Sequence, residues 1–310
     1  MLISFVIPCY RSELTIRNVV EEIKESMAKL KDHSFEIVLV NDASPDNTLS
    51  VIKDLVKENS NITGIDFSKN FGQHSALMAG LRETKGDYVI CLDDDGQTPA
   101  DEAYKLIDAL DKGADAVYAS YDKKKHSAFR NFGTFMNEKM AEVMLGKPKN
   151  IFVSSYFGVK RFIVDDMANY KNAYPYVIGL VLRSTKNIVN VPVHHRNREV
   201  GSSGYTFSKL LNLWINGFTA FSVKPLRIAT AFGATFAVLG FLYGIYTVIK
   251  RLIYTDIPIG YSALMSAVVF IGGMLMMMLG LVGEYIGRMY ISLNNSPQYV
   301  LREKIVHEEK

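Results

Sequence analysis

The first 120 residues alternate between short apolar runs and longer segments in which apolar side chains recur every three or four positions. Short apolar runs are typical of strands covered on both faces, and the longer periodic segments are typical of amphipathic helices. The pattern predicts strands at residues 2–8, 35–40, 62–67, 87–92 and 114–119, and helices at about 12–30, 44–57, 75–83 and 100–110. This alternation with short connections predicts an α/β domain built on a mostly parallel sheet.

The pattern changes completely after about residue 220. Residues 228–249 and 262–283 are nearly uncharged apolar stretches, and each, at about 22 residues, is long enough to cross a hydrocarbon core of about 30 Å. The short connection at 250–261 predicts a two-helix transmembrane hairpin with both flanks on one side. Lys and Arg are more frequent in the flanks than in the connection, which favours flanks in the cytoplasm.

Residues 206–227 join the two regions and carry apolar side chains, Trp214 and several basic residues. We expect an amphipathic helix in the membrane interface, although a core helix of the soluble domain remains open. The predicted organisation is a domain at 1–205, interface helices at 206–227, a hairpin at 228–290 and a tail at 291–310. The start of the chain lacks the features of a cleaved signal peptide, so we expect the first domain to stay in the cytoplasm of a multi-pass plasma-membrane (inner-membrane) protein.

Composition excludes several classes of function. A net charge of +3 carries no strong nucleic-acid signal. Cys9 and Cys91 both fall at predicted strand ends, where small buried residues are a better interpretation than a disulfide or a metal site. The chain has no Gly-x-Gly-x-x-Gly after its first strand and no Gly-Lys-Ser/Thr, which disfavours dinucleotide-binding and P-loop sites.

The fourth predicted strand ends directly in three carboxylates, Asp93, Asp94 and Asp95. Adjacent negative charges repel one another unless a cation or a proton relieves them. Alternation along the chain points Asp93 and Asp95 to one side and Asp94 to the other. One hypothesis is a divalent-cation site for a nucleoside diphosphate, because hard cations prefer oxygen ligands. The alternative is a solvated acidic turn that opens the next helix.

Other polar residues also follow predicted strands: Tyr10, Glu13, Asp42, Lys69 and Asn70. The carboxyl ends of parallel strands meet at one edge of a sheet, where such folds bind ligands. We therefore expect these side chains to gather with the three carboxylates, which favours the cation site over the solvated turn.

Two basic segments leave alternatives open. The segment 123–126 is either a solvated loop or a contact for anionic head groups or phosphates. The segment 191–198, which contains His195 and Arg198, is either a surface strand or a phosphate-binding cluster. A zinc pair is disfavoured, since adjacent histidines on a strand point in opposite directions.

The ordered motifs resemble glycosyltransferase family 2. Residues 6–10 with Glu13, residues 40–46 and residues 92–99 are similar to its Pro-x-Tyr-Asn-Glu, Asp-Gly-Ser-x-Asp and Asp-x-Asp blocks. Three further stretches resemble the polyprenyl-phosphate group of that family, which includes undecaprenyl-phosphate aminoarabinose transferases, bactoprenol glucosyltransferases and dolichol-phosphate mannose synthases. These stretches are 70–80, 192–205 and 283–288, so the resemblance covers nearly the whole chain.

The resemblance implies a GT-A fold, Mg²⁺ or Mn²⁺, a nucleotide-sugar donor, and inverting transfer to a polyprenyl phosphate at the cytoplasmic face of a lipid bilayer. A homo-oligomer is plausible. Carried over by position, the implied donor-binding residues are Pro8, Tyr10, Glu13, Asp42, Lys69, Asn70, Asp93 and Gln97. The implied metal ligands are Asp93 and Asp95, and the implied acceptor or phosphate residues are Arg130, His195, Arg198, Ser203 and Tyr205. The implied catalytic residues are Asp95, Arg130 and Arg198.

The chain departs from the family pattern at three places. Many relatives carry a carboxylate where this chain has Ser154 and Ser155, and many carry Lys where it has Gly204. Asp94 stands where relatives carry Ala, so we expect it to face away from the metal. The missing carboxylate keeps open a non-catalytic membrane protein that retains the fold. A processive polysaccharide synthase is disfavoured, since the chain lacks a Gln-x-x-Arg-Trp motif and further spans.

Overall fold

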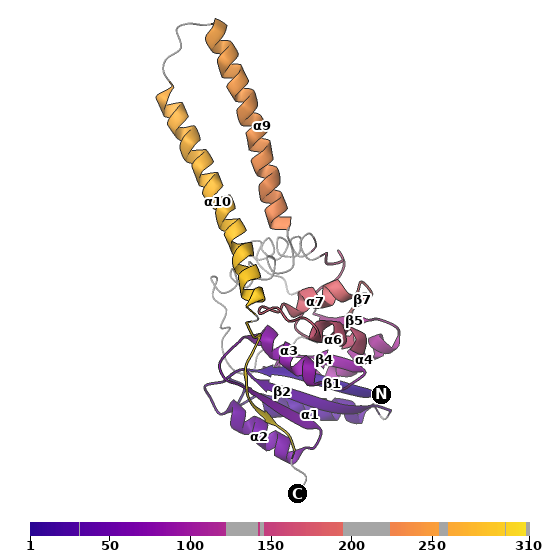
Figure 1. The fold of residues 1–310 in the computed structure, drawn as a ribbon. Coiled ribbons are helices and arrows are strands. Elements are labelled where there is room, and N and C mark those ends of the chain that lie inside the picture. Colours follow the sequence, from indigo (N-terminus) through magenta and orange to yellow (C-terminus); the bar gives the residue numbers. More distant parts are fainter. Residues whose placement is uncertain are drawn as a thin grey trace. The chain divides into compact units, whose positions relative to one another are not determined.

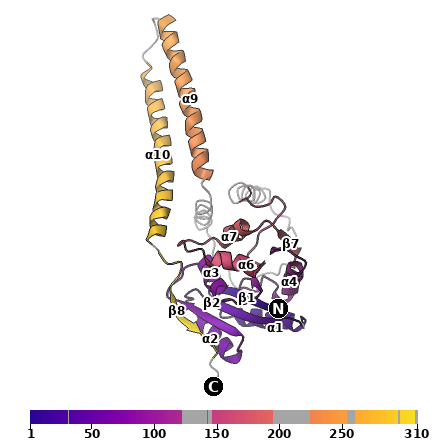
Figure 2. The same cartoon turned by 45° about the vertical axis from the view of Figure 1, so that its right-hand side comes forward.

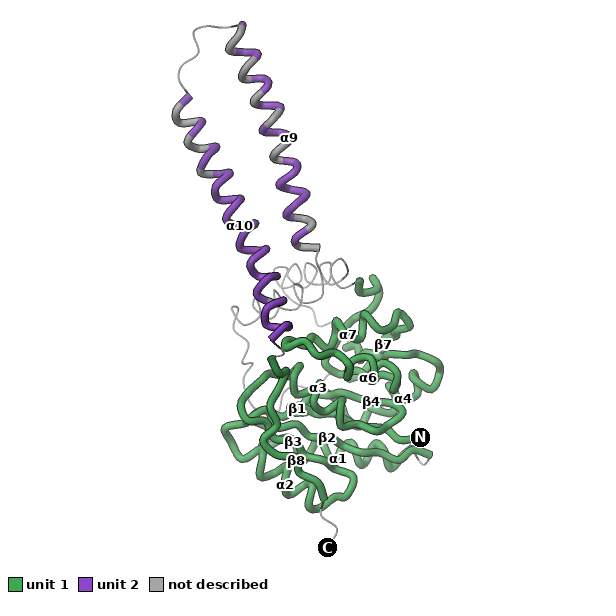
Figure 3. Tube along the Cα trace, viewed as in Figure 1, with its two compact units in different colours: residues 1–217, 295–310 green, residues 218–294 purple. Residues whose placement is uncertain are grey.

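The computed structural model describes residues 1–30, 32–121, 142, 146–194, 224–253, 260–294 and 296–307. The chain divides into two compact units, which are coloured separately in Figure 3. The first unit consists of residues 1–217 together with 295–310, and the second of residues 218–294. The C-terminal residues therefore return to the unit in which the chain began.

The first unit is built on a sheet flanked by helices (Figure 1). The sheet has eight strands in the order β7-β5-β6-β4-β1-β2-β3-β8. The strands are β1 (Leu2–Cys9), β2 (Ser34–Asn41), β3 (Ile62–Phe67), β4 (Tyr88–Cys91), β5 (Ala116–Ser120), β6 (Phe157–Lys160), β7 (Ile188–Pro192) and β8 (Leu301–Ile305). The neighbours β3, β2, β1 and β4 are parallel. Strand β6 is antiparallel to both β4 and β5, and β8 is antiparallel to β3. The sheet is therefore mostly parallel, as predicted.

Helices cover both faces of this sheet, and successive side chains of its central strands are buried on opposite faces. The helices are α1 (Ile16–Ala28), α2 (Thr48–Glu58), α3 (Gln73–Glu83), α4 (Ala103–Asp111), α6 (Arg161–Ala168) and α7 (Val177–Ser184), and the 3₁₀ turn η1 (Ala100–Glu102) precedes α4. Ile37 and Leu39 of β2 belong to the core formed with α1, α2 and α4. Val38 and Val40 point the other way, into the core formed with α3.

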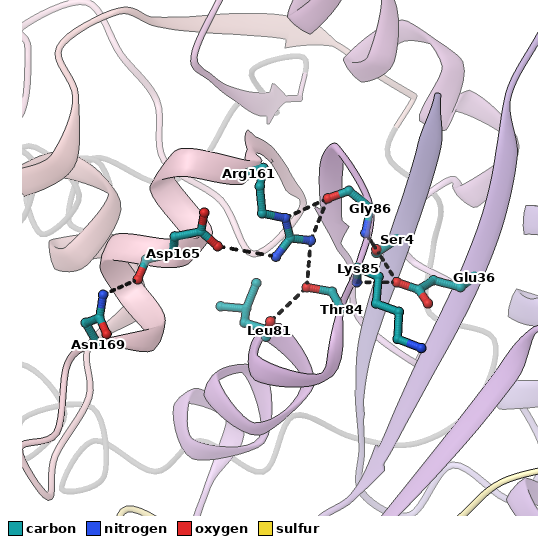
Figure 4. Close-up of polar contacts among 9 residues, drawn as sticks. All are labelled: Ser4, Glu36, Leu81, Thr84, Lys85, Gly86, Arg161, Asp165 and Asn169. Carbon is teal, nitrogen blue, oxygen red and sulfur yellow. Dashed lines mark hydrogen bonds and ion pairs between the residues drawn. The ribbon is translucent and has the colours of Figure 1, made fainter.

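A polar network ties the amino-terminal edge of the sheet together (Figure 4). Arg161, at the start of α6, donates from Nε to the carbonyl oxygen of Gly86 at 2.8 Å and from Nη2 to Oγ1 of Thr84 at 3.2 Å. The Gly86 amide donates to Oγ of Ser4 at 2.8 Å, and that hydroxyl donates to the Glu36 carboxylate at 2.6 Å. This network joins β1, β2 and the approach to β4, and it leaves the opposite edge of the sheet for ligands.

The second unit contains two long helices, α9 (Lys224–Ile253) and α10 (Tyr261–Leu293), which lie side by side (Figures 1 and 2). They approach closely at Gly233, where an added Cβ would lie 3.4 Å from Sδ of Met278. Most of their described large apolar side chains are exposed, including Met276 and Leu279. By length and composition, one segment of the described helices, Phe270–Ile291, is apolar enough to cross a membrane, and Ala229–Gly240 is a shorter apolar segment.

The helix starts differ from the prediction at two points. α1 begins at Ile16 and α2 at Thr48, later than the predicted positions 12 and 44. Ser44, at the predicted start of the second helix, instead donates from Oγ to the Cys9 carbonyl at 3.4 Å. The Asp46 carboxylate accepts from the Thr48 amide at 3.2 Å at the start of α2. The loops after β1 and β2 are therefore longer than predicted, and both contribute to the edge described below.

Two antiparallel strands, β6 and β8, are not among the strands whose ranges were predicted. Strand β5 is separated from β4 by β6, which forms from residues 157–160 and runs antiparallel to both. Strand β8 forms within the segment predicted to be a tail, and it extends the sheet beside β3. Both strands come from far along the chain, so the local pattern of residues carries no information on their partners.

Candidate active site

The carboxyl ends of β1, β2, β3 and β4 form one edge of the parallel sheet, and the four loops that follow them are joined by hydrogen bonds. The loop after β1 is tied to the loop after β2 by the Arg11 amide, which donates to Oγ of Ser44 at 3.1 Å. Gln73, after β3, donates to the Asp93 carboxylate, after β4, at 2.8 Å. The predicted gathering of polar residues at this edge is therefore present.

Asp94 links the loop after β4 to the loop after β1. Its carboxylate accepts from the Tyr10 amide at 3.0 Å and also from the Ser12 hydroxyl. Burial raises the pKa of Asp94, and the bonds from Ser12 and Tyr10 oppose that shift. Asp94 thus holds neighbouring backbone in place, in agreement with the expectation that it turns away from Asp93 and Asp95.

Asp93 is partly buried and accepts a hydrogen bond on each carboxylate oxygen. Gln73 Nε2 lies 2.8 Å from one oxygen, and Ser155 Oγ lies 2.5 Å from the other. Burial raises the pKa of Asp93 from 3.8 to about 6, with further increases from the charges of Asp95 and Asp94, while the bonds from Ser155 and Gln73 lower it. A carboxyl in this state is stabilised in its charged form by a nearby cation.

Asp95 lies in a tight turn in the same loop, after β4. Its carboxylate accepts from the Gln97 amide at 3.0 Å, and the intervening Gly96 has a φ of 72°, a conformation that glycine adopts without strain. The pKa of the Tyr121 phenol is raised by burial and by the charges of Asp93 and Asp95. Tyr121, which follows β5 and was not among the predicted residues, is therefore near enough to feel the charges of both carboxylates.

Asp42 lies in the loop after β2 and is almost fully buried. Its carboxylate oxygens accept from the backbone amides of Phe71 at 2.7 Å and Gly72 at 2.8 Å, and its carbonyl accepts from Nδ2 of Asn70 at 3.2 Å. Burial raises the pKa of Asp42, and the two amide bonds oppose this shift. Asp42 and Asn70 thus fix the two loops against each other, and Gly72 supplies the positive φ, 88°, at the start of α3.

The remaining predicted donor residues differ in exposure. Tyr10 is 46% exposed at the edge, and the Arg11 guanidinium lies 5.6 Å from the centre of its ring. Pro8 is buried within β1, opposite Val40. A flat exposed ring beside a cation suits stacking with a nucleotide base, whereas Pro8 contributes to the shape of the strand end.

Glu13 and Lys69 interact with neighbouring loops. The Glu13 carboxylate accepts from the Asn47 amide at 2.9 Å, just before α2 begins. The Lys69 ammonium is exposed and lies 5.0 Å from the centre of the Phe71 ring. Glu13 therefore supports the loop after β2, and Lys69 supplies a positive charge at the edge.

The two serines at the position where relatives keep a carboxylate have different partners. Ser154 donates to backbone carbonyls, those of Ala119 at 2.9 Å and Tyr156 at 2.8 Å, which are alternative acceptors for one hydroxyl proton. Ser155 donates to the Asp93 carboxylate. Ser155, which the sequence had singled out at this position, thus contacts Asp93, whereas Gln73 and Ser12 were recognisable as contacts of the carboxylates only once the loops were placed together in space.

The predicted acceptor residues Arg130, His195, Arg198, Ser203 and Tyr205 lie outside the described residues. So do the basic segment 123–126 and residues 206–223 of the predicted interface helix. His194 is described and is exposed; its Nδ1 lies 2.7 Å from the Glu102 carboxylate.

The carboxylate oxygens at the end of β4 suit a divalent cation that would also be bound by phosphate oxygens of the substrate. Among the described residues, no group of three or more His, Cys, Asp or Glu side chains gathers to form a complete metal cage. Mg²⁺ commonly takes only one or two carboxylates from the protein and the remaining oxygens from substrate phosphates and water. Asp93 and Asp95 could serve as two such carboxylates, and a bound cation would relieve the effect by which the charge of Asp95 raises the pKa of Asp93.

Similarity to known proteins covers both units. Residues 4–168 match the model of glycosyl transferase family 2, and residues 224–289 match the model described as the GtrB C-terminal hairpin. The undecaprenyl-phosphate 4-deoxy-4-formamido-L-arabinose transferases of Klebsiella pneumoniae (strain 342) and Proteus mirabilis (strain HI4320) are each 30% identical over 311 residues. These alignments cover 99% of this chain and 94% and 95% of the relatives.

A solved structure shares the fold of the first unit. Glucosyl-3-phosphoglycerate synthase from Mycobacterium tuberculosis, crystallised with Mn²⁺, uridine diphosphate and phosphoglyceric acid, superposes with a TM-score of 0.50 at 18% identity. The match covers 69% of this chain and 74% of that chain. At this identity the likeness concerns the fold, and it agrees with the GT-A-like α/β architecture.

Proposed function

The chain belongs to glycosyltransferase family 2, and from that membership we propose that it transfers a sugar from a nucleotide-sugar to a polyprenyl phosphate. The observation that carries the proposal is the full-length similarity to enzymes named for transfer to undecaprenyl phosphate, which includes the C-terminal helices. The carboxylates at the ends of the parallel strands supply the site that such a reaction needs.

The donor would bind along the edge formed by the loops after β1 to β4. Tyr10 would stack on the base, and Asp42, Asn70, Glu13 and Pro8 would shape the loops around the base and ribose. Lys69 would add a positive charge, and Gln97 would line the sugar side. Asp93 and Asp95 would hold Mg²⁺ or Mn²⁺, which when bound would neutralise charge on the diphosphate leaving group. The hydrogen bonds that join these loops support one continuous site.

The acceptor phosphate would attack the anomeric carbon in line with the leaving group, which inverts the configuration. A bond forms between that carbon and a phosphate oxygen, the bond to the nucleoside diphosphate breaks, and the diphosphate departs. A phosphate monoester already carries about 1.5 to 2 negative charges near neutral pH, so the reaction needs no strong base. Arg130, Arg198, His195, Ser203 and Tyr205 would hold the phosphates, and orientation and charge would carry the catalysis.

The sheet supports a hairpin in the membrane. Strand β3 precedes helices α9 and α10 in the chain and β8 follows them, yet β3 and β8 are hydrogen-bonded neighbours. Both ends of the intervening segment must therefore be on the same side of a bilayer, which requires an even number of crossings. At about 1.5 Å per residue, each helix is about 45 to 50 Å long and can span the hydrocarbon core.

We place the site at the cytoplasmic face of the plasma (inner) membrane, with interface helices at 206–227 close to the lipid head groups. The proposed domain order is a catalytic domain at 1–205, these helices, a hairpin at 228–290 and C-terminal residues at 291–310. The excess of Lys and Arg outside the loop at 250–261 supports this orientation.

The test is transfer of a radiolabelled sugar to undecaprenyl phosphate by the purified full-length protein in detergent. A panel of nucleotide-sugars is supplied with Mg²⁺ or Mn²⁺, and product is counted in the organic phase. We expect one donor to label the lipid and chelation to stop it. Asp95→Asn should insert into membranes normally and lose turnover. Full activity of Asp95→Asn with metal chelated would overturn the metal assignment.

A second candidate function is a non-catalytic membrane protein that retains the fold. The observation that favours it is the pair Ser154 and Ser155 where many relatives keep a carboxylate. It predicts that no nucleotide-sugar labels the lipid or is hydrolysed in the presence of metal. Labelling by any donor in the panel would exclude it.

A further inference from the structure

The residues that follow α10 form a segment that packs directly behind the proposed donor site. This C-terminal segment comprises residues 298–305 and includes β8, where Glu303 pairs with Asp66 and Leu301 with Phe67 of β3. Figures 2 and 3 show β8 at the edge of the sheet. We propose that the C-terminal segment is a positioning element of the donor site, which holds the loops after β2 and β3 in their binding geometry. This inference rests on the proposed function.

The first line of contact begins at Arg302. Its Nη2 donates to the Ser68 carbonyl at 3.0 Å, and its Nη1 lies 3.5 Å from the Asp66 carboxylate, which is almost fully buried. The other Asp66 oxygen accepts from Nδ2 of Asn41 at 2.7 Å, and Oδ1 of Asn41 accepts from the Ser44 amide at 3.2 Å. A continuous polar chain thus runs from Arg302 to the turn that carries Asp42.

This turn needs support because its backbone is strained. Ala43 has a φ of 50°, which is uncommon for a residue other than glycine. Asn41 and Asp42 directly precede Ala43 and are both nearly fully buried. Without Arg302, the Asp66 carboxylate would keep its bond to Asn41 but lose its counter-charge, and the pair that anchors the turn would be weakened.

The second line of contact is aromatic and is independent of the first. Tyr299 stacks on Phe67 with ring centres 5.1 Å apart and planes 9° apart, and Phe67 meets Phe71 edge-on at 5.7 Å. Arg82 donates to the Tyr299 hydroxyl at 3.0 Å, which fixes the ring. Phe71 is the residue whose amide holds the Asp42 carboxylate. The stack therefore reaches Asp42 through Phe71, by a route that does not involve Asn41.

Strand β8 also carries side chains that provide a matched control. Lys304 lies two residues from Arg302 and pairs with Glu83 near the end of α3. Both Lys304 and Arg302 are exposed basic residues of the same strand, and each has an acidic partner. Among the contacts of the described residues, Glu83 pairs with Lys304 and does not reach the loops after β2 or β3, so loss of Lys304 removes a β8 ion pair without touching the two lines of contact.

The test compares Arg302→Ala, Tyr299→Ala and Lys304→Ala in the full-length protein. Amide hydrogen exchange needs no ligand and reports directly on the loops. We expect exchange at the amides of Ser44, Phe71 and Gly72 to rise about tenfold or more in the first two variants and to stay at the wild-type rate in Lys304→Ala. Equal exchange in Arg302→Ala and Lys304→Ala would overturn the polar line, and unchanged exchange in Tyr299→Ala would overturn the aromatic line.

Kinetics with the donor found in the radiolabel screen provide the functional readout. We expect the KM for the donor to rise about tenfold in Arg302→Ala with kcat within about twofold of wild type, which is the pattern for lost ground-state binding. Arg302→Lys keeps the positive charge with fewer hydrogen-bond donors. It should fold normally, and its KM for the donor should lie between those of the wild type and Arg302→Ala. An unchanged donor KM in both Arg302 variants would contradict the inference. If the wild type transfers no sugar, the proposed function fails, and hydrogen exchange still decides whether the segment positions the loops.

Discussion

At the scale of single residues, the site depends on how each of three adjacent carboxylates is used. The sequence placed Asp93 and Asp95 on one side and Asp94 on the other, and the bonds of Asp94 to Tyr10 and Ser12 agree with that alternation. Gln73 and Tyr121 were not predicted, and no partner was predicted for Ser155, because all three lie on segments distant in the chain from Asp93 and Asp95. Alternation within a strand is a local property, whereas the partners of a carboxylate depend on how the loops fold.

Asp93 should make binding of the cation dependent on pH. Its pKa is raised to about 6, so the folded protein holds this proton more tightly than the unfolded chain does. The stability that comes from Asp93 is therefore present at low pH and is lost as pH rises through about 6. A cation requires the charged form, so Mn²⁺ affinity should fall as pH drops below about 6. Electron paramagnetic resonance of free Mn²⁺ measures this without acceptor, whose phosphate also titrates near 6. A constant affinity from pH 5 to 7.5 would contradict the assignment.

Ser155 should influence the pH dependence of Mn²⁺ binding, and Ser154 should not. The bond from Ser155 lowers the pKa of Asp93, so Ser155→Ala should move the acidic fall in Mn²⁺ affinity to higher pH. Ser154→Ala is the matched control, since its hydroxyl meets only backbone carbonyls among the contacts described for it. It should lower thermal stability and leave the pH profile in place. Identical profiles for the two variants would show that the Ser155 bond has no influence on Asp93.

At the scale of elements, the parallel half of the sheet was predictable and the antiparallel strands were not. Strands β1 to β4 are apolar runs separated by periodic helices, and the parallel order follows from that alternation. Strand β6 has only four residues, and β8 is Leu-Arg-Glu-Lys-Ile, with four of its five side chains exposed. An exposed edge strand needs no apolar pattern, because its backbone pairing with β3 supplies most of what holds it. No local signal distinguished it from a tail.

Arg161, in the network at the amino-terminal edge of the sheet, should contribute more to stability than Arg183, which forms a surface ion pair with α6. Arg161→Ala leaves the buried Gly86 carbonyl without two of its donors, which should cost about 1–3 kcal/mol and lower Tm by several degrees. Arg183→Ala is the matched control, because Arg183 also pairs with an aspartate of α6 but is half exposed. Its loss should cost less than about 1 kcal/mol. Thermal unfolding of the full-length protein in detergent compares them, and equal shifts would refute the structural role given to Arg161.

At the scale of the whole molecule, the path of the chain constrains its topology in a membrane. The sequence predicted two spans from hydropathy, and the described helices contain one segment that meets the length and composition of a span together with one shorter apolar segment. Hydropathy alone therefore leaves open whether the chain crosses once or twice. The pairing of β8 with β3 argues against a single crossing, because one crossing would separate two strands that are hydrogen-bonded neighbours.

Introduced cysteines test this topology, because the two native thiols are buried and their pKa values are raised, which makes them unreactive. Gly260→Cys lies at the start of α10, between the two helices, and Val306→Cys lies just beyond β8, where the native side chain is exposed. In intact cells a membrane-impermeant maleimide should label Gly260→Cys and spare Val306→Cys until the membrane is permeabilised. The two helices would then cross as a pair, with the catalytic unit and β8 together inside.

Labelling of Val306→Cys in intact cells, with Gly260→Cys protected, would place the sheet outside and reverse the proposed orientation. Labelling of neither before permeabilisation would mean that α9 and α10 do not form a hairpin across the bilayer.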